Sequence, residues 1–338
     1  MSADIKNTGR KKRDSPDTIL KVKNLKTYFF TGRGVVKAVD DISFDLRKGE
    51  SLCLVGESGC GKTTAALSIL GLIERPGKTI AGEIFYYDQD FLKYSPEQLR
   101  KIRGRKIAMI FQDPESSLNP VFTIGDQITE QIKLHLGLND RQAREKAIGL
   151  MKQVGIPGTE RRIDDYPHQF SGGMKQRAMI AMALSCEPEI LIADEPATAL
   201  DVTIQAQILD IFQDLKEERH MSNIFITHDL GVVAEVADKI VVMYGGRVAE
   251  AGTVLDIFDD PRHPYTVGLI DCLPDVSRTK GRLTFIPGTI PSLVEPPEGC
   301  IFHPRCQKTM SICMEERPPE VTISEEHSVV CHLYSHHE

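Results

Sequence analysis

The sequence has no apolar run near the roughly 18 residues that a membrane-spanning helix needs, and no apolar core of a signal peptide at its start. We therefore expect a cytoplasmic chain that neither spans a membrane nor enters the secretory route. The sequence also lacks an excess of basic residues, because 41 lysines and arginines stand against 48 acidic residues and the formal net charge is −7. Without a global positive field, we expect no nucleic-acid partner.

The chain does not have the cysteine pattern of a disulfide-stabilised secreted protein, although it contains eight cysteines in 338 residues. Four are scattered along the chain. The other four crowd the C-terminus with the spacing C-x5-C-x6-C-x17-C, at Cys300, Cys306, Cys313 and Cys331. Proline and glycine are frequent around them and helical periodicity is weak, so a bound metal could supply the order of this segment.

Four separated thiolates suit the corners of a [4Fe–4S] cluster, which is the favoured prediction for this segment. Zinc sites usually contain close C-x2–4-C pairs, and this spacing has none. Two alternatives remain: a zinc site, to which His303 or His332 could contribute, and cysteines that are free or paired in disulfides.

Residues 1–17 lack hydrophobic periodicity and carry the basic run Arg10–Arg13. Such a polar, charged stretch cannot bury enough apolar surface to fold, so we predict a solvated, disordered tail. Anionic lipid or nucleic acid as a ligand of the basic run is a minor alternative. The remaining length is ample for a buried core and for two or three structural units.

The stretch Ser51–Thr64 is typical of a nucleotide-binding loop between a buried strand and a helix. It fits the pattern G-x-x-x-x-G-K-[ST], with Gly56, Gly61, Lys62 and Thr63 at the fixed positions. The glycines let successive backbone N–H groups point at phosphate oxygens, and the helix N-terminus adds partial positive charge. The lysine is placed for the β- and γ-phosphates and the threonine hydroxyl for Mg²⁺.

Two strands are predicted over residues 19–46, on either side of a turn at Gly32–Gly34, as an antiparallel unit before a parallel α/β core. They bring the aromatic residues Tyr28, Phe29 and Phe30 close in sequence to the nucleotide loop. One of these rings could stack on an adenine face. Alternatively, all three belong to the core or the surface of the sheet.

Three further strands of the parallel core end in polar side chains. The strand at 106–112 ends in Gln112, the strand at 189–195 ends in Asp194 and Glu195, and the strand at 223–227 is followed by His228. A carboxylate at the end of a strand beside the phosphate loop is suited to Mg²⁺, which fits Asp194. Glu195 could polarise an attacking water, and His228 could reach the γ-phosphate. A helix cap, a turn and an ordinary strand-end histidine are the alternatives.

A second anion site is predicted where Ser171, Gly172 and Gly173 precede a strong helix over residues 174–185. A serine N-cap followed by two glycines leaves backbone N–H groups and the helix dipole facing outward. Taken alone, the same residues could be an ordinary helix cap. Between the strand at 106–112 and this helix, residues 125–136 and 141–154 have helical periodicity, which indicates a helical insertion in the core.

Taken in order, these motifs resemble those of an ATP-binding cassette over residues 18–255. The matching stretches are GESGCGKT (56–63), Gln112, FSGGM (170–174), ILIADEP (190–196), ALD (199–201) and THD (227–229). The resemblance implies an α/β P-loop NTPase fold with a RecA-like parallel sheet, an N-terminal antiparallel β subdomain and an α-helical subdomain at about 113–170. It also implies a head-to-tail dimer with ATP between the phosphate loop of one subunit and the Ser-Gly-Gly motif of the other.

The resemblance also implies a role for each matched residue. Thr63, Gln112 and Asp194 would surround Mg²⁺. Glu195 would be the catalytic carboxylate, assisted by His228 and Gln112, and Asp201 would lie in the loop that joins the two sites. The implied ATP-binding residues are Tyr28, Phe29, Gly56, Ser58, Gly59, Cys60, Gly61, Lys62, Thr63, Thr64, Gln112, Ser171, Gly172 and Gly173.

Phe29 best matches the family's adenine-stacking position and Tyr28 is its rival. Met174 departs from the family's usual glutamine after Ser-Gly-Gly, which puts a side-chain role at that position in doubt. Cys60 in the phosphate loop is interpreted as a small residue at a position that does not contact the nucleotide, rather than as a redox switch.

Beyond Gly252 the chain resembles a narrower group, the ATPases of dipeptide and oligopeptide importers and their nickel-importing relatives. The resemblance rests on Pro261–Thr266, Ile286–Gly288 and Gly299–Cys306, and within the core on FQDP (111–114), SLNP (117–120) and YPHQFSGGM (166–174). It implies a C-terminal extension, residues 256–338, that contains the four-cysteine site.

The resemblance to this group also implies partners and a location. These are two transmembrane permease subunits, a second ATPase subunit that is either a paralogue or a second copy, and, indirectly, an extracytoplasmic peptide-binding protein. The chain would lie at the cytoplasmic face of the cell membrane as a peripheral subunit. Alternative functions are a soluble ATPase without a transport role, an importer of nickel or another small solute, and an ATPase gated by a metal- or redox-sensing C-terminal module.

Overall fold

The computed structural model describes residues 17–196, 202–273 and 286–335. The tail predicted for residues 1–17, apart from Asp17, and the motif at 199–201 lie outside the described residues. In the ranges that are described, none of the helices has both the length and the apolar character that crossing a membrane requires.

Parallel strands form the larger part of an eight-stranded sheet with the order β11-β12-β10-β9-β3-β8-β7-β6. All side chains of β3 (SLCLV) and β7 (ILIAD) are buried, as expected for parallel strands covered on both faces. Parallel strands end at a common edge, so the residues that follow them meet there. The parallel strands are β3 (Ser51–Val55), β6 (Ile107–Ile110), β7 (Ile190–Asp194), β8 (Ser222–Thr227) and β9 (Lys239–Tyr244).

A second sheet is antiparallel and has the order β2-β1-β4-β5. As the alternating sequence predicts, its first two strands are joined by a tight turn at Gly32 and Arg33. Its buried side chains share one hydrophobic core with helix α1, which follows the phosphate loop. The elements are β1 (Thr18–Thr31), β2 (Gly34–Arg47), α1 (Lys62–Ile69), β4 (Gly77–Tyr86), β5 (Gln89–Asp90) and, after them, α2 (Pro96–Ile102).

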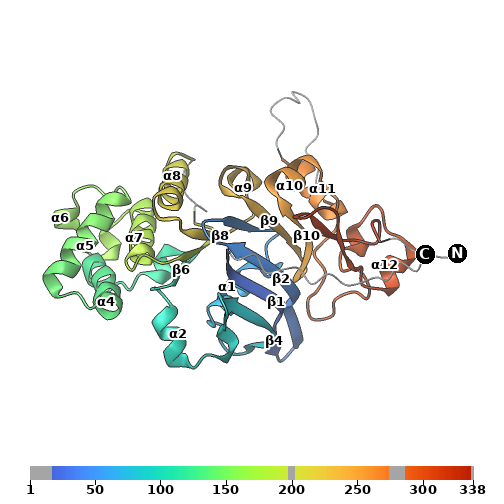
Figure 1. Ribbon diagram of the computed structural model, residues 1–338, viewed down its shortest axis with the longest axis horizontal. Helices are drawn as coiled ribbons and strands as arrows, with labels where there is room; N and C mark the ends of the chain where they lie inside the picture. The colour runs from blue at the N-terminus through green and yellow to red at the C-terminus, as the bar shows by residue number, and fades with distance from the viewer. Residues whose placement is uncertain (1–16, 197–201, 274–285, 336–338) are drawn as a thin grey trace.

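The helices predicted after β6 are present and gather at one end of the molecule (Figure 1). The two long ones begin with capping boxes, Thr123 with Asp126 and Asn139 with Gln142, so backbone N–H groups at each start have a side-chain acceptor. The helices are α3 (Pro114–Ser117), α4 (Ile124–Leu136), α5 (Asp140–Gln153), α6 (Thr159–Arg162) and α7 (Gly172–Leu184). The subdomain boundaries at 113 and 170 stay a prediction.

The C-terminal part of the chain is joined to the large sheet. β10 pairs on one side with β9 and on the other with β12, which in turn pairs with β11. Residues treated as a separate extension in the sequence therefore extend the core sheet. The elements are α8 (Val202–Arg219), α9 (Leu230–Val236), β10 (Arg247–Thr253), α10 (Val254–Asp259), α11 (Pro264–Asp271), α12 (Ser311–Glu315), β11 (Glu320–Thr322) and β12 (Ser328–Val330).

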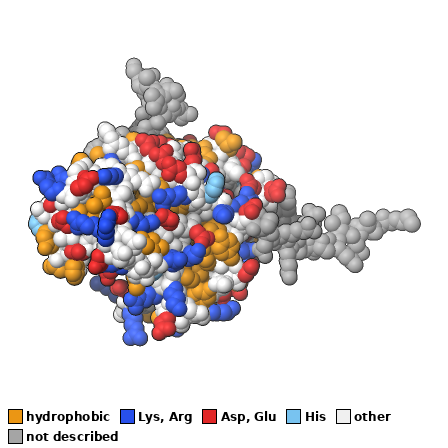
Figure 2. Space-filling view, turned by 60° about the vertical axis from the view of Figure 1, so that its left-hand side comes forward, with side chains coloured by type: hydrophobic (Ala, Val, Ile, Leu, Met, Phe, Trp, Pro, Cys, Tyr) orange, Lys and Arg blue, Asp and Glu red, His pale blue; other side chains and the backbone are white. Residues whose placement is uncertain are grey.

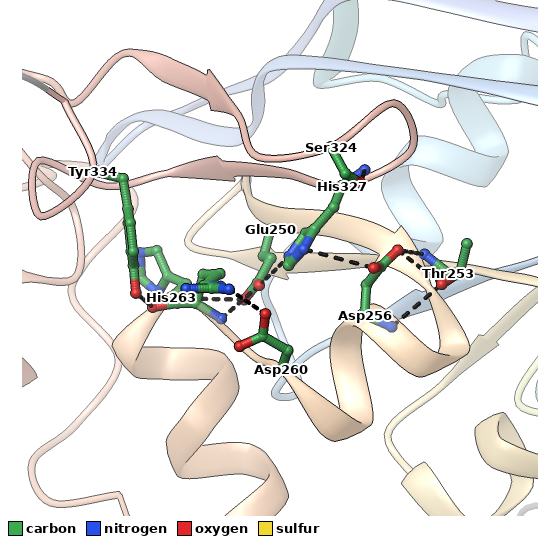
Figure 3. Close-up of polar contacts among 9 residues, drawn as sticks. Glu250, Thr253, Asp256, Asp260, His263, Ser324, His327 and Tyr334 are labelled. Carbon is green, nitrogen blue, oxygen red and sulfur yellow. Dashed lines mark hydrogen bonds and ion pairs between the residues drawn. The ribbon is translucent and has the colours of Figure 1, made fainter.

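The buried carboxylate of Glu250 on β10 stabilises the contact between the large sheet and the C-terminal region (Figure 3). It accepts hydrogen bonds from the backbone N–H groups of Arg262 (2.7 Å) and His263 (2.9 Å) before α11, and lies 2.7 Å from Nε2 of His327 before β12. The hydroxyl of Tyr334 donates to the carbonyl oxygen of Arg262 at 3.0 Å. Two stretches of the C-terminal region are thus bound directly to β10 through Glu250, and Tyr334 is bound to the first of them.

Candidate nucleotide site

The phosphate loop runs from the end of β3 to α1 in a conformation that requires glycine. Gly56, Gly59 and Gly61 have φ values of 152°, 82° and 103°, in the left-handed region that side chains disfavour. A Cβ atom would lie 2.2 Å from the carbonyl oxygen of Met243 at Gly56, and 2.1 Å from that of Ala38 at Gly61. The loop is therefore closely packed against the end of β9 and against β2, which fixes the direction of its N–H groups.

Lys62 is 6% exposed and bends back over the loop. Its Nζ donates to the carbonyl oxygens of Gly56 (2.6 Å) and Glu57 (3.2 Å). Cys60 is buried beside it, 3.8 Å from Nζ, and burial raises the pKa of its thiol. Ser58 and Gly59 are exposed at the crest of the loop, where a phosphate could approach.

Asp194, at the end of β7, is 2% exposed, and its Oδ1 atom has no hydrogen-bond partner among the described residues. Burial raises the pKa of this carboxyl and the charge of Glu195 adds to the effect, whereas a hydrogen bond from Thr63 and the charge of Lys62 lower it. A buried carboxylate oxygen without a donor is costly unless a cation compensates it. The pair Thr63 and Asp194 therefore fits a Mg²⁺ ion.

Glu195 lies between two side chains that come from neighbouring strand ends. Its Oε1 is 3.0 Å from Nδ1 of His228 after β8, and its Oε2 accepts from Nε2 of Gln112 at 2.8 Å after β6. Its backbone has φ 46°, unusual for a residue with a side chain, and its N–H donates to the carbonyl oxygen of Ile226 at 2.8 Å. The left-handed residue separates the directions of Asp194 and Glu195, so the two acids have different surroundings.

Gln112 contacts Glu195 in this structure, at the same edge of the sheet as Thr63 and Asp194. The predicted residues Gln112, Asp194, Glu195 and His228 thus all follow or end parallel strands and meet at the edge that carries the phosphate loop. A carboxylate held by an amide on one oxygen and an imidazole on the other is arranged to accept a proton from water.

The aromatic residues at the end of β1 have different partners. The hydroxyl of Tyr28 donates to Oδ1 of Asp40 at 2.6 Å, and burial together with this carboxylate raises the pKa of Tyr28 to about 12. Phe29 packs over Gly77, where a Cβ atom would lie 2.7 Å from the ring. Phe30 is 50% exposed.

Ser171 is the N-cap of α7, and its Oγ accepts from the N–H of Met174 at 3.3 Å. Ser171 and Gly172 are exposed, whereas most of α7 is buried. Further along α7, the side chain of Gln176 donates to the carbonyl oxygen of Pro196 at 2.6 Å. This hydrogen bond connects the helix to the residue after Glu195. In Figure 1, α7 lies with α4–α6, away from α1, so the two predicted anion sites are at separate places on one chain.

The four C-terminal cysteines form no disulfide in the structure, with Cys313 and Cys331 buried and Cys300 and Cys306 partly exposed. Burial and the neighbouring thiols raise the pKa of Cys300, and they raise that of Cys331 to about 11. These effects place the thiols within electrostatic reach of one another. In the described part of the chain, however, no group of three or more His, Cys, Asp or Glu residues is arranged to hold a metal ion. The predicted [4Fe–4S] and zinc sites therefore gain no support from the structure.

Several residues of this region were not found from the sequence. Glu57, between Gly56 and Ser58, pairs with Arg305, and Asp40 binds Tyr28, Arg247 and Arg317. Glu57 occupies a variable position of the loop motif, and the partners are far away in the sequence. No local pattern marks such pairs.

Comparison with known proteins places these features in a family. The profile of the ABC transporter family matches residues 39–198, and that of the oligopeptide/dipeptide transporter C-terminal region matches residues 249–313. A dipeptide transport ATP-binding protein of Bacillus subtilis is 49% identical over 318 residues, which cover 94% of this chain and 95% of that protein. Its counterpart in Escherichia coli is 46% identical over 314 residues, 93% of this chain and 96% of that protein.

Among solved structures, a dimeric ATP-binding cassette in a post-hydrolysis state with ADP and Pi is similar in fold. Its TM-score is 0.64 and its sequence identity 27%, over 70% of this chain and 98% of that chain. The fold and the site thus define an ATP-hydrolysing cassette, and the predicted P-loop NTPase fold is confirmed. The chain belongs to the ABC transporter ATPases, in the group that carries the oligopeptide/dipeptide transporter C-terminal region.

Proposed function

We propose that this chain binds and hydrolyses ATP to energise a membrane importer of dipeptides or oligopeptides. The observation that supports it best is the meeting of Gln112, Glu195 and His228 beside the phosphate loop, in a chain whose relatives are named as peptide transport ATP-binding proteins. The relatives favour this function over a non-transport ATPase or a nickel importer.

The phosphate loop binds the triphosphate in this proposal. Backbone N–H groups of residues 58–64 donate to phosphate oxygens, and Lys62 exchanges its loop carbonyl partners for the β- and γ-phosphates. Thr63 and Asp194, with Gln112, hold Mg²⁺, which neutralises charge on the phosphate oxygens. The uncompensated Oδ1 of Asp194 supports this assignment.

Glu195 acts as the general base. It accepts a proton from water as the water oxygen bonds to the γ-phosphorus and the bond from that phosphorus to the bridging oxygen of ADP breaks. His228 and Gln112 keep its two carboxylate oxygens in place. Phe29 stacks on adenine, because the hydroxyl end of Tyr28 is already committed to Asp40.

The site is completed by a second cassette, either a paralogue or another copy of this chain. Ser171, Gly172 and Gly173 are exposed or partly exposed at the start of α7, apart from the α1 end of the same chain (Figure 1). Free N–H groups at a helix start favour an anion, so they would contact the γ-phosphate held by the partner. Hydrolysis then depends on dimer closure.

Permease subunits would bind near β6 and the helical end, at the cytoplasmic face of the membrane. Exposed apolar side chains after β6 support this: Phe111 is 39%, Val121 71% and Phe122 52% exposed. Figure 2, with the helical end brought forward, shows apolar patches among charges of both signs. An extracytoplasmic peptide-binding protein would act through the permeases and not touch this chain.

The cofactor of the four-cysteine segment is a separate part of the proposal and depends on the sequence spacing. Four cysteines that are well separated in sequence would suit a cluster, whereas zinc sites usually contain close C-x2–4-C pairs, so we keep [4Fe–4S] ahead of zinc. The contribution of neighbouring thiols to the raised pKa values of Cys300 and Cys331 supports their proximity.

The function is tested in cells that carry the transporter with the Glu195→Gln variant of this chain. We expect loss of uptake of labelled dipeptides and resistance to toxic peptide analogues, with nickel accumulation unchanged. Complementation by the unaltered chain is the control. Loss of nickel uptake with normal peptide uptake would overturn the peptide assignment.

A further inference from the structure

The four-cysteine segment reaches the phosphate loop through Arg305, which lies between Cys300 and Cys306. The side chain of Arg305 is 4% exposed, and that of Glu57 is 27% exposed. Nη1 donates to Oε2 of Glu57 at 2.6 Å and Nη2 donates to Oε1 at 3.0 Å. Two parallel charge-assisted hydrogen bonds fix both the position and the plane of a carboxylate.

The guanidinium itself is held from several sides. Its Nε donates to the carbonyl oxygen of Pro287 at 2.9 Å, and Nη2 also donates to that of Ile286 at 3.2 Å. Its centre lies 5.7 Å from the ring of Tyr244, whose hydroxyl accepts from Nη1 at 3.3 Å. A lysine has one compact donor group and could not replace this fork.

On its other side, Glu57 is connected directly to the nucleotide-binding lysine. The N–H of Glu57 donates to the hydroxyl of Tyr265 on α11 at 2.9 Å, and its carbonyl oxygen accepts from Nζ of Lys62 at 3.2 Å. Both the side chain and the peptide groups of Glu57 are thus bound. Because Glu57 is held in one orientation, the directions of the backbone N–H groups that follow it in the loop are also set.

A second arginine of the same segment contacts Asp40 on β2, which also binds Tyr28 of β1. Nη2 of Arg317, which follows Cys313 and α12, donates to Oδ2 of Asp40 at 3.0 Å. Asp40 is 2% exposed and also accepts from Tyr28 (2.6 Å) and Arg247 (2.9 Å). Tyr28 precedes Phe29, the residue proposed to stack on adenine.

We propose that Arg305 and Arg317 are positioning residues through which the docked four-cysteine segment acts on the nucleotide site. Arg305 holds the phosphate loop, and Arg317, through Asp40, holds the end of β1 that carries Tyr28 and Phe29, in the geometry that binds ATP. Neither arginine touches the substrate in this proposal. ATP affinity therefore depends on a part of the chain outside the cassette motifs, and a change in the fold of the cysteine segment is transmitted to the nucleotide.

The test is steady-state ATP hydrolysis and direct nucleotide binding by the full chain with Arg305→Met and Arg305→Lys. For Arg305→Met we expect KM and the dissociation constant of ATP to rise about tenfold, with a smaller change in kcat, because the loop is misplaced before the chemical step. Arg305→Lys restores charge without the fork, so it recovers only part of the affinity. Arg317→Met should weaken ATP binding in the same direction.

The matched control is Glu326→Gln, which breaks another tether between the C-terminal region and the core. Glu326 pairs with Arg47 at 2.6 Å, at the end of β2 that leads into the start of β3, opposite the phosphate loop. We expect unchanged KM for this variant. An equal rise in KM for Glu326→Gln would show that docking in general, and not the arginine contacts, sets affinity, and would overturn the proposal.

Glu57→Gln covers the case in which Arg305→Met does not fold, since it keeps the shape of the side chain. We expect Glu57→Gln to raise KM, and its effect not to add to that of Arg305→Lys in the double variant, as for residues that act as one pair. Additive effects, or a KM unchanged in folded Glu57→Gln, would overturn the proposal.

Discussion

Oε1 of Glu195 lies 3.0 Å from Nδ1 of His228, and the other oxygen of this carboxylate lies 2.8 Å from Nε2 of Gln112. The side chain of Glu195 is 11% exposed and that of His228 is 54% exposed. A nearly buried acid is thus bridged to a half-exposed imidazole at the mouth of the site.

Glu195→Gln should bind ATP and lose turnover. The amide keeps the size of the side chain but cannot accept the proton of water, so we expect kcat to fall by about 100-fold or more. Phosphate release measures turnover, and size-exclusion chromatography with ATP measures the dimer, which should accumulate. Gln112→Glu is unsuitable as a control because it adds charge. Turnover close to normal in Glu195→Gln would contradict the role of this residue.

In the Asp194→Asn variant, the free energy of unfolding should no longer depend on Mg²⁺. The buried Oδ1 has no donor among the described residues, so removing the charge should raise the free energy of unfolding without Mg²⁺ by about 1 kcal/mol. Added Mg²⁺ with nucleotide should stabilise the unaltered chain and have little effect on the variant. Thermal unfolding of the unaltered chain and of the variant, each with and without Mg²⁺, measures this difference. Destabilisation of the metal-free variant would show that Asp194 has a structural partner instead.

Phe29→Ala should weaken ATP binding more than Tyr28→Phe does. Stacking on a base contributes about 1–3 kcal/mol, so we expect about a tenfold or greater loss of affinity for Phe29→Ala. Tyr28→Phe removes only the hydrogen bond to Asp40. Titration with a fluorescent ATP analogue measures both variants. The reverse order of effects would identify Tyr28 as the stacking residue.

Stability should fall as pH drops from about 6.5 to about 4. Burial lowers the pKa of His263 to about 4, from 6.5. Between these pH values His263 is protonated in the unfolded chain but remains neutral in the folded chain. The free energy of unfolding therefore decreases on acidification, by about 2–3 kcal/mol in total. Denaturant unfolding at several pH values measures the slope, and His263→Gln should reduce it. An unchanged slope in that variant would assign the dependence to other groups.

The chain purified without oxygen should contain iron and absorb broadly in the visible range if the cysteine segment binds a [4Fe–4S] cluster. Cys313→Ser should abolish both signals, and Cys272→Ser, outside the segment, is the matched control. Through Arg305 and Arg317, loss of the cluster should also raise the KM for ATP. A colourless protein with one zinc ion would show the alternative site.

Sequence reasoning found the elements whose information is local. The glycine spacing and the flanking apolar runs identified the phosphate loop, and helical periodicity over 125–136 and 141–154 indicated α4 and α5. It also singled out Gln112, Asp194, Glu195 and His228 at the ends of parallel strands, and the structure brings these strand ends to one edge of the sheet. Their roles in catalysis stay predictions. Sequence reasoning did not find that Gln112 contacts Glu195, since the choice of partner depends on the left-handed turn at Glu195.

The sequence by itself determined the α/β core and the order of its motifs, because short-range periodicity and spacing encode them, and the resemblance of those motifs to an ATP-binding cassette indicated the ATPase family. Only the tertiary structure decided that β12 joins the core sheet beside β10. It also decided that Arg305 forms an ion pair with Glu57, which is 248 residues away in the sequence. Such pairs form when the folded backbone brings distant residues together, and their energy comes from burial and geometry that no local pattern contains.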